Sequence, residues 1–527
     1  MLPTKTAEDH TKDEWRQPYF SPPRWKPVSV LTLVLLAAIA TALRFFFLAR
    51  KPFWFDECFS VEVARFSWHD FVRLMWWREA NMSLYYLLLR GWLALGSIVG
   101  WEFAPFFIRT LSVVASLATL PALYWLGSKL FDRRVGMIAL ALFSCNAYSI
   151  RYAQEARSYS FFLLLATLSS GFFVSCFRQP TRFTRRNYVL ASVLAVYAHL
   201  YALLLVAAQC ISLQRLKVPR PEGKGVPLLP AFRRLWISIA VAVLPLLAFV
   251  AKTGAGPIRW ISRPGFHEIL NFWEQLAGNN GLPLLLLYLA ACLATILPLR
   301  RRLLRLGADW DIWHYQFLLI WLILPVVLTL LLSLVRPLFL GRYFIFCLPP
   351  LILLAAAGLA SLRATWMMGV CLAATLLLSL QGTLSYYDHD FDVDRDGSGA
   401  ASGYILDHSQ PGDAILFHIA EARIPYEFFR SMRENHSAEG AAPAPEIIFP
   451  RHADHLDYRD VTGKPSIELV QSIPARHDRV WLVLMNNGTP EHPDATTLML
   501  KQRLAEVFPH QEQVQFPQVE IILYGKR

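Results

Sequence analysis

Long apolar runs alternate with short polar segments from residue 28 to residue 384. A helix needs about 20 apolar residues to cross a bilayer, and only segments that pair their own backbone polar groups can span its interior. The runs therefore predict transmembrane helices rather than strands. The predicted single crossings are residues 28–49, 108–127, 135–150, 158–177, 235–252, 282–299, 314–335, 343–362 and 366–384.

Two further apolar runs do not fit a single crossing. Residues 188–213 have arginines and lysines before and after them, so both ends belong on the cytoplasmic side. A hairpin of two short helices with its tip near His199 satisfies this pattern and gives a total of about eleven helices. Residues 84–99 are short and carry Arg90, so they either span or lie flat. The cations at 129–134 favour the flat helix, inside one large loop of residues 50–107.

The polar ends of the chain fix the predicted orientation. Residues 1–27 form a polar, basic tail rather than the short n-region and cleavage site of a signal peptide. The first run is therefore predicted to be an uncleaved span with a cytoplasmic N-terminus. The loop 50–107 and the C-terminus then lie on the external side of the membrane.

Composition supports a polytopic membrane protein. Hydrophobic residues make up 55% of the 527 residues and charged residues 17%, with a mean hydropathy of +0.36, which is too apolar for a soluble protein of this length. The net charge of +12 could indicate nucleic acid, but the cations cluster in short loops, as they do on the cytoplasmic side. All cysteines except Cys58 lie in apolar segments, so neither a disulfide framework nor a zinc cluster is predicted.

The chain changes character after residue 384. The polar segment DHDFDVDRDGSG leads into short β-rich runs, with one helical pattern, TTLMLKQRLAEVF, between the last two. Alternating strand and helix patterns predict a small soluble α/β domain over residues 385–527, following a membrane domain of residues 28–384. No Gly-rich phosphate loop occurs in it, which argues against a nucleotide-dependent enzyme.

Asp56 and Glu57 stand next to each other just beyond the first predicted span, among aromatic residues typical of a membrane surface. A carboxylate at this position could act as a general base or could bind a divalent metal. The alternative is that both acids are solvated loop residues or cap a helix. The residues alone leave these alternatives open.

Five segments follow one another in an order that resembles the GT-C glycosyltransferases. They are WFDECFSVEVA, LYYLLLRGWLALG, RTLSVVASLATLPALYWLGSKLFDRRVGMIALALFS, YSIRYAQEARSYSFFLLL and RPLFLGRYFIFCLPPLILLAAAGLA. Within that superfamily the chain is similar to the bacterial family 39 and protein O-mannosyltransferase-like group, which includes the aminoarabinose transferase of lipid A. The resemblance covers roughly residues 28–385 and fades over the C-terminal tail.

The resemblance implies transfer of a hexose or pentose from a polyprenyl-phosphate donor to a lipid, glycan or protein acceptor. Transfer would take place on the external face, with inversion at the anomeric carbon. In a bacterium the chain would lie in the inner membrane, with its C-terminal domain in the periplasm or outside the cell. No cofactor is certain, and a divalent metal at Asp56 is an open alternative. The alternative functions are a transporter or flippase of a lipid-linked glycan and an inactive relative that binds the lipid carrier.

The resemblance also implies roles for individual residues. Asp56 would be the base or metal-associated acid, with Glu57 supporting it. The residues expected to bind the donor phosphate or the substrate are Arg44, Glu155, Arg157, Tyr159, His199, Arg342 and Tyr343. The arginines could instead snorkel or anchor the chain at the membrane surface, and the histidine could be a satisfied core residue.

The chain departs from the family pattern just before the LYY run. Many relatives have His-Pro-Pro or Lys-Pro-Pro there, whereas this chain has Asn81, Met82 and Ser83. No cation or imidazole is available at these positions. The departure weakens the expectation of aminoarabinose transfer in particular.

Overall fold

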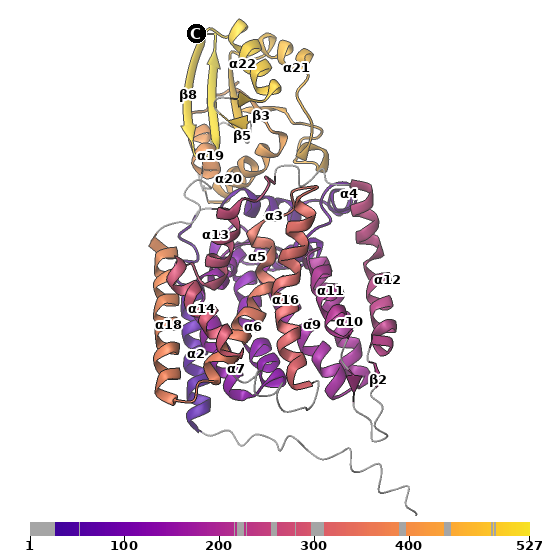
Figure 1. The fold of residues 1–527 in the computed structure, drawn as a ribbon. Helices are drawn as coiled ribbons and strands as arrows, with labels where there is room; N and C mark the ends of the chain where they lie inside the picture. Colours follow the sequence, from indigo (N-terminus) through magenta and orange to yellow (C-terminus); the bar gives the residue numbers. More distant parts are fainter. Residues whose placement is uncertain are drawn as a thin grey trace, which may run out of the picture.

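The structure is a computed structural model in which a helical bundle carries a small α/β domain at one end (Figure 1). It describes residues 27–51, 53–214, 217–218, 226–227, 229–253, 261–279, 281–296, 310–388, 397–436, 444–485, 488–489 and 492–526. Nearly all of the predicted N-terminal tail, and the cations at residues 300–305, lie outside the described residues.

The bundle helices follow the predicted apolar runs. They are α2 (Pro27–Phe45), α6 (Pro105–Leu130), α7 (Arg133–Ser144), α8 (Ala147–Ala153), α9 (Tyr159–Arg178), α12 (Leu229–Thr253), α14 (Gly281–Ala294), α16 (Trp310–Ser333), α17 (Leu348–Ala360) and α18 (Thr365–Asp388). Among the described residues, six helices are long and apolar enough to cross a membrane, or seven if α14 and the bent α13 (Phe266–Ala277) form one span. The fold class is confirmed, and the total of about eleven helices stays a prediction.

Two predicted spans are broken where the sequence supplies a local reason. The run 135–150 divides into α7 and α8, because Asn146 caps the second helix by accepting a hydrogen bond from the backbone N–H of Ser149. The run 343–362 opens with the 3-10 helix η3 (Gly341–Cys347) before α17. Prolines fit the first turn of a helix, and α17 has two there, Pro349 and Pro350.

The predicted hairpin is confirmed. Helices α10 (Arg182–Ala198) and α11 (Ala202–Ser212) are separated by a turn at His199. The hydroxyl of Tyr188, near the start of α10, donates to Oε1 of Gln209, near the end of α11, at 2.8 Å. This bond requires the two helices to run back alongside each other, which places His199 at the tip.

The loop after α2 folds into α3 (Phe55–Arg65), α4 (Trp68–Trp77) and α5 (Ser83–Ser97). The surface position of α5 stays a prediction. On α4, the side chains of Trp68, Trp76 and Trp77 are exposed, and Nζ of Lys252 in α12 lies 3.2 Å from the ring centroid of Trp77. Exposed tryptophans beside a cation are typical of the interface between lipid and water.

The C-terminal domain is a five-stranded mixed sheet between two helical layers. Its strands lie in the order β4 (Glu446–Phe449), β3 (Ala414–His418), β5 (Arg479–Met485), β9 (Val519–Gly525), β8 (His510–Phe516). The pairs β4–β3 and β3–β5 are parallel, and β5–β9 and β9–β8 are antiparallel. Helices α19 (Gly397–His408) and α20 (Arg423–His436) share one apolar core with the sheet, and α21 (Ile467–Ser472) and α22 (Ala495–Val507) share the other. The predicted α/β fold of the domain is confirmed.

Helix α20 packs directly on α3, so the α/β domain lies over the loop that carries the acid pair (Figure 1). Ile424 and Phe428 of α20 belong to the same buried cluster as the bundle and its loop. The first residue of α3, Phe55, packs in turn against the core on the α19 and α20 side of the sheet. Two domains that are distinct in sequence therefore share apolar packing around α3.

Candidate functional site

Helix α3 places both acids of the predicted motif in its first turn. The helix begins after Trp54, whose backbone is extended, and Asp56 and Glu57 follow within the first turn. Backbone N–H groups at a helix N-terminus favour negative charge, so this position suits two carboxylates. The side chains nevertheless differ in exposure, with 17% of Asp56 and 1% of Glu57 accessible to solvent.

Glu57 is enclosed by strong bonds. Arg109 of α6 holds it in a bidentate ion pair, with Nε 2.8 Å from Oε1 and Nη2 2.7 Å from Oε2. The backbone N–H of Ala156 also donates to Oε1 at 2.7 Å. Nη1 of Arg109 donates to the carbonyl oxygens of Leu48 and Lys51. The pair thus joins α6, α3, the end of the first predicted span and the loop before α9.

Asp56 has looser partners. Its Oδ2 lies 3.5 Å from Nη2 of Arg157 and 3.4 Å from Nη2 of Arg342. Charge-assisted hydrogen bonds are usually about 2.7–2.9 Å long, so both ion pairs are longer than tight bonds. Arg157 is also held by Nη1, which donates to the backbone oxygen of Asp56 and to Oγ of Ser60. Two guanidinium groups therefore flank one partly accessible carboxylate.

A further acid that the motifs did not single out lies near this carboxylate. Burial raises the pKa of Glu79 to about 7, while the nearby Arg157 opposes the shift and Asp56 adds to it. Glu79 comes between the end of α4 and the segment in which the chain departs from the family pattern. Neither spacing nor composition marked it, because its closeness to Asp56 arises from the fold of the loop.

Tyr159, His199 and Tyr343 form an aromatic cluster beside the arginines. The ring centroids of His199 and Tyr343 are 4.7 Å apart, and those of Tyr159 and His199 are 6.3 Å apart. Both arginines, Arg157 and Arg342, are close enough to act electrostatically on His199 and Tyr159. Five of the predicted site residues therefore gather around Asp56, although they come from three separate regions of the chain.

Three buried polar atoms in this cluster have no hydrogen-bond partner among the described residues. They are Nε of Arg157, the hydroxyl of Tyr159 and Nε2 of His199. The backbone N–H of Tyr201 donates to Nδ1 of His199, which assigns the proton of the neutral ring to Nε2. Buried donors are costly when unpaired, so their gathering here fits a ligand rich in acceptor oxygens.

The hairpin tip is tied to the segment that departs from the family pattern. The backbone N–H of Leu200 donates to Oδ1 of Asn81 at 3.1 Å, and Met82 adopts a left-handed conformation with a φ of 69°. Asn81 therefore holds the tip that carries His199.

Two predicted residues make their contacts elsewhere. Arg44 is fully buried; its Nε donates to Ser116 Oγ at 2.8 Å and its Nη2 to Ser149 Oγ at 3.0 Å, and its other hydrogen bonds go to backbone oxygens. Glu155 lies 3.5 Å from Nε of Arg151, measured at Oε1. Arg44 thereby connects α2 to α6 and α8, and Glu155, in the loop after α8, pairs with Arg151 of that helix.

Among the described residues, no group of three or more His, Cys, Asp or Glu side chains is placed to hold a metal ion. Asp56 has cations rather than further carboxylates as its closest charged partners. The donor set around it therefore does not form a zinc-type site of three or four protein ligands, whereas a Mg²⁺ ion held by one carboxylate and the donor phosphate would need no such group.

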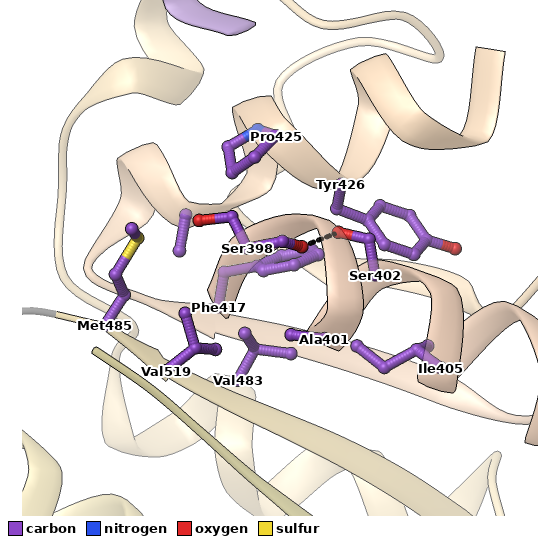
Figure 2. A pocket seen from close by; sticks show the side chains of 11 residues that line it. Ser398, Ala401, Ser402, Ile405, Phe417, Pro425, Tyr426, Val483, Met485 and Val519 are labelled. Carbon is purple, nitrogen blue, oxygen red and sulfur yellow. Dashed lines mark hydrogen bonds between the residues drawn. The ribbon is translucent and has the colours of Figure 1, made fainter. Parts of the chain in front are cut away.

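A hollow inside the α/β domain lies between α19, α20 and the sheet (Figure 2). Strand residues Phe417, Val483 and Met485 line it, and Oγ of Ser402 donates to the backbone oxygen of Ser398 beside it. No charged side chain lines this hollow. It is a gap in an apolar core, and the candidate chemistry lies at α3.

Solved structures match the chain, although no family model and no curated protein sequence does. The apo crystal structure of ArnT from Cupriavidus metallidurans matches with a TM-score of 0.56 and 11% identity, covering 94% of this chain and 98% of that chain. The same protein bound to undecaprenyl phosphate matches with a TM-score of 0.56 and 12% identity, covering 93% and 97%. An oligosaccharyltransferase from Archaeoglobus fulgidus gives a TM-score of 0.48 at 10% identity, covering 86% and 67%. The predicted resemblance is confirmed in the architecture, because the chain has the same fold as ArnT.

Proposed function

We propose that the chain transfers a sugar from a polyprenyl-phosphate donor to an acceptor hydroxyl or amine on the external face of the membrane. The observation that carries this proposal is the placement of the Asp56 carboxylate between Arg157 and Arg342, beside three buried, unpaired hydrogen-bond donors. ArnT, which has the same fold, has been crystallised with undecaprenyl phosphate, and this supports a lipid-linked donor here.

In the proposed reaction Asp56 accepts the proton of the acceptor while the acceptor atom forms a bond to the anomeric carbon. The bond from that carbon to the phosphate oxygen breaks at the same time, and the phosphate leaves with the electron pair. Arg157 and Arg342 stabilise the charge that develops on the phosphate. Attack opposite the leaving group inverts the anomeric centre.

The other residues divide between binding and support. Tyr159 and His199 are proposed to donate hydrogen bonds to the phosphate or the sugar, and Tyr343 to pack against the substrate. Glu57 is proposed to be a positioning residue, because Arg109 already satisfies it. Arg44 and Glu155 are proposed to hold the bundle and the loop rather than the donor, because Arg44 donates to Ser116 and Ser149 and Glu155 pairs with Arg151.

The proposed setting is a bacterial inner membrane with the α/β domain on the external side. A transporter of lipid-linked glycans is the alternative, and transporters usually place their polar groups near the bilayer midplane. The polar cluster of this chain gathers instead around α3, at the end of the bundle covered by the α/β domain (Figure 1). This arrangement favours transfer over transport.

Sugar transfer from a panel of labelled polyprenyl-phosphate sugars tests the proposal. Native protein, Asp56→Asn and the control Asp407→Asn, an exposed acid on α19, are compared at matched amounts. We expect native and Asp407→Asn to move label from the carrier to an acceptor, and Asp56→Asn to be at least about 100-fold slower. Equal rates in Asp56→Asn would remove Asp56 from the chemistry. Movement of intact labelled carrier across the membrane, with no transfer, would favour the transporter.

A further inference from the structure

We propose that the α/β domain positions the acids of the proposed active site, through Phe428 and Glu421, and thereby controls the rate of turnover. This inference rests on the proposed function and adds to it two positioning residues from outside the membrane domain. Two independent lines of contact, one aromatic and one ionic, support it.

The aromatic line runs from α20 to the acid pair. The ring of Phe428 stacks on that of Phe53, with centroids 4.9 Å apart and planes at 24°. The guanidinium carbon of Arg109 lies 4.7 Å from the same Phe53 ring. Arg109 holds Glu57, the neighbour of Asp56, through its bidentate pair. All four residues, from Phe428 to Glu57, are buried, so a displacement of α20 has no solvent-filled space to absorb it.

The ionic line ends at Arg78, one residue before Glu79, the acid near Asp56. Nη2 of Arg78 lies 2.8 Å from Oε1 of Glu421, which is in the short helix η5 (Ala420–Ala422) directly after β3. Arg78 is the C-cap residue of α4 and the chain neighbour of Glu79. Both charges are partly exposed, so the pair contributes more to geometry than to stability.

The domain is rigid at the surface it presents to α3. Arg423 at the start of α20 is buried, with Nη1 2.9 Å from Oδ2 of Asp460 and Nη2 2.8 Å from Oε1 of Glu427. Phe55, immediately before Asp56, packs against the core of the same domain. Helix α3 is therefore held between two packed bodies, with the acids at the end where these bodies meet.

Such contacts would act on turnover more than on donor binding. Arg157 and Arg342, the proposed phosphate ligands, come from the loop before α9 and from η3 of the membrane domain rather than from the α/β domain. Proton transfer is sensitive to displacements of about 1 Å, which can lower a rate about 100-fold. Loss of either contact should therefore lower kcat while leaving the KM for the donor nearly unchanged.

Charge reversal tests the ionic line in the full-length protein. The variants are Arg78→Glu, Glu421→Arg and their combination, with two readouts: kcat and KM for the donor, and hydrogen–deuterium exchange of residues 55–65. We expect each single variant to lower kcat about tenfold, to change the donor KM by less than about twofold and to speed exchange in α3. The combined variant should restore both kcat and exchange, because it rebuilds the pair with reversed signs.

A matched control is the ion pair between Arg433 and Asp407, which join α20 and α19 inside the α/β domain at 2.6 Å. Arg433→Glu should leave kcat and exchange in α3 unchanged. Phe428→Ala should behave like the single reversals, and Phe428→Leu should recover part of the lost rate, because it restores apolar contact with Phe53.

Unchanged kcat together with unchanged exchange in the single variants would overturn the inference, as would an equal loss in Arg433→Glu. If the native protein transfers no sugar from any donor, the proposed function fails. Exchange in α3 still decides this inference in that case: faster exchange that the combined variant reverses supports positioning, and unchanged exchange refutes it.

Discussion

Glu57 lies in a bidentate ion pair with Arg109, with oxygen-to-nitrogen distances of 2.7 and 2.8 Å, and both side chains are almost fully buried. Its neighbour Asp56 has ion pairs of 3.4 and 3.5 Å and keeps some access to solvent. Two adjacent acids of the same motif therefore differ: Glu57 lies in a tight bidentate ion pair, and Asp56 lies in longer ion pairs with two arginines.

The buried pair leads to a prediction about stability. Arg109→Met leaves the carboxylate of Glu57 buried and uncompensated, so we expect the free energy of unfolding to fall by about 3–5 kcal/mol. Adding Glu57→Gln to this variant removes the uncompensated charge and should recover part of the loss. Thermal unfolding in detergent measures both, and a double variant no more stable than Arg109→Met would contradict this reading.

The arginines beside Asp56 should not be replaceable by lysine. Arg342→Lys keeps the positive charge but loses the planar fork that can bind two phosphate oxygens, so we expect kcat to fall by roughly 10- to 100-fold. Arg336→Lys, at an exposed position before the same segment, is the control and should retain full activity. An unchanged kcat in Arg342→Lys would mean that this guanidinium serves only as a point charge or as an anchor at the membrane surface.

Glu79 should make donor binding depend on pH. Burial raises its pKa to about 7, so the carboxyl becomes charged as the pH rises through 7. The new negative charge lies near Asp56 and repels an anionic donor, and the KM for the donor should rise between about pH 6 and pH 8. Steady-state kinetics of native protein and Glu79→Gln across this range provide the check. The same rise in both proteins would assign it to another group.

Glu62 should link stability to pH where the α/β domain meets α3. Burial raises its pKa to about 7, Arg65 opposes the shift from 3.0 Å away, and Glu427 of α20 adds to it. An acid whose pKa is raised by folding contributes fully below its unfolded value, near 4.5, and this contribution is lost as the pH rises through 7. The Tm should therefore fall between about pH 5 and pH 8, and less so in Glu62→Gln. An exposed acid on α20, changed in Glu434→Gln, should leave the slope unaltered.

Replacing Tyr159 by Phe should stabilise the protein without ligand and should weaken the additional stabilisation that a bound ligand provides. Its buried hydroxyl has no hydrogen-bond partner among the described residues, so Tyr159→Phe should raise the free energy of unfolding without ligand by about 1 kcal/mol. The same change should reduce the stabilisation that polyprenyl phosphate produces, because a donor to the phosphate is lost. Thermal unfolding with and without polyprenyl phosphate separates these effects. Equal stabilisation of both proteins would show that the hydroxyl does not meet the ligand.

The sequence predicted those helices and strands whose formation follows from the residues of a single segment of the chain. Apolar runs located the bundle helices, and positive charge on both sides of 188–213 located the hairpin at His199. Strand β8 was missed because its residues, HQEQVQF, lie at the exposed edge of the sheet and carry no apolar alternation. The break at Asn146 was also missed, because a capping residue within an apolar run is a weak signal.

The candidate site was predictable only where a motif named its residues. Asp56, Arg157 and Arg342 were marked, and the structure brings them together. Arg109 and Glu79 were not predicted as site residues. An arginine at the start of a span and an acid in a loop are common, and only the folded structure shows which residues lie next to them. Pairing of this kind depends on contacts between segments that are far apart in the chain.

The exposed tryptophans of α4 have a consequence for how a donor would arrive. Trp68, Trp76 and Trp77 suit the headgroup layer, and α4 follows α3 directly in the chain. On the proposed function, Asp56 would then lie near the depth at which the phosphate of a polyprenyl carrier rests while its chain remains in the lipid. Such a donor would reach the site by lateral diffusion in two dimensions, and its encounter rate would depend on its density per membrane area rather than on its concentration in water.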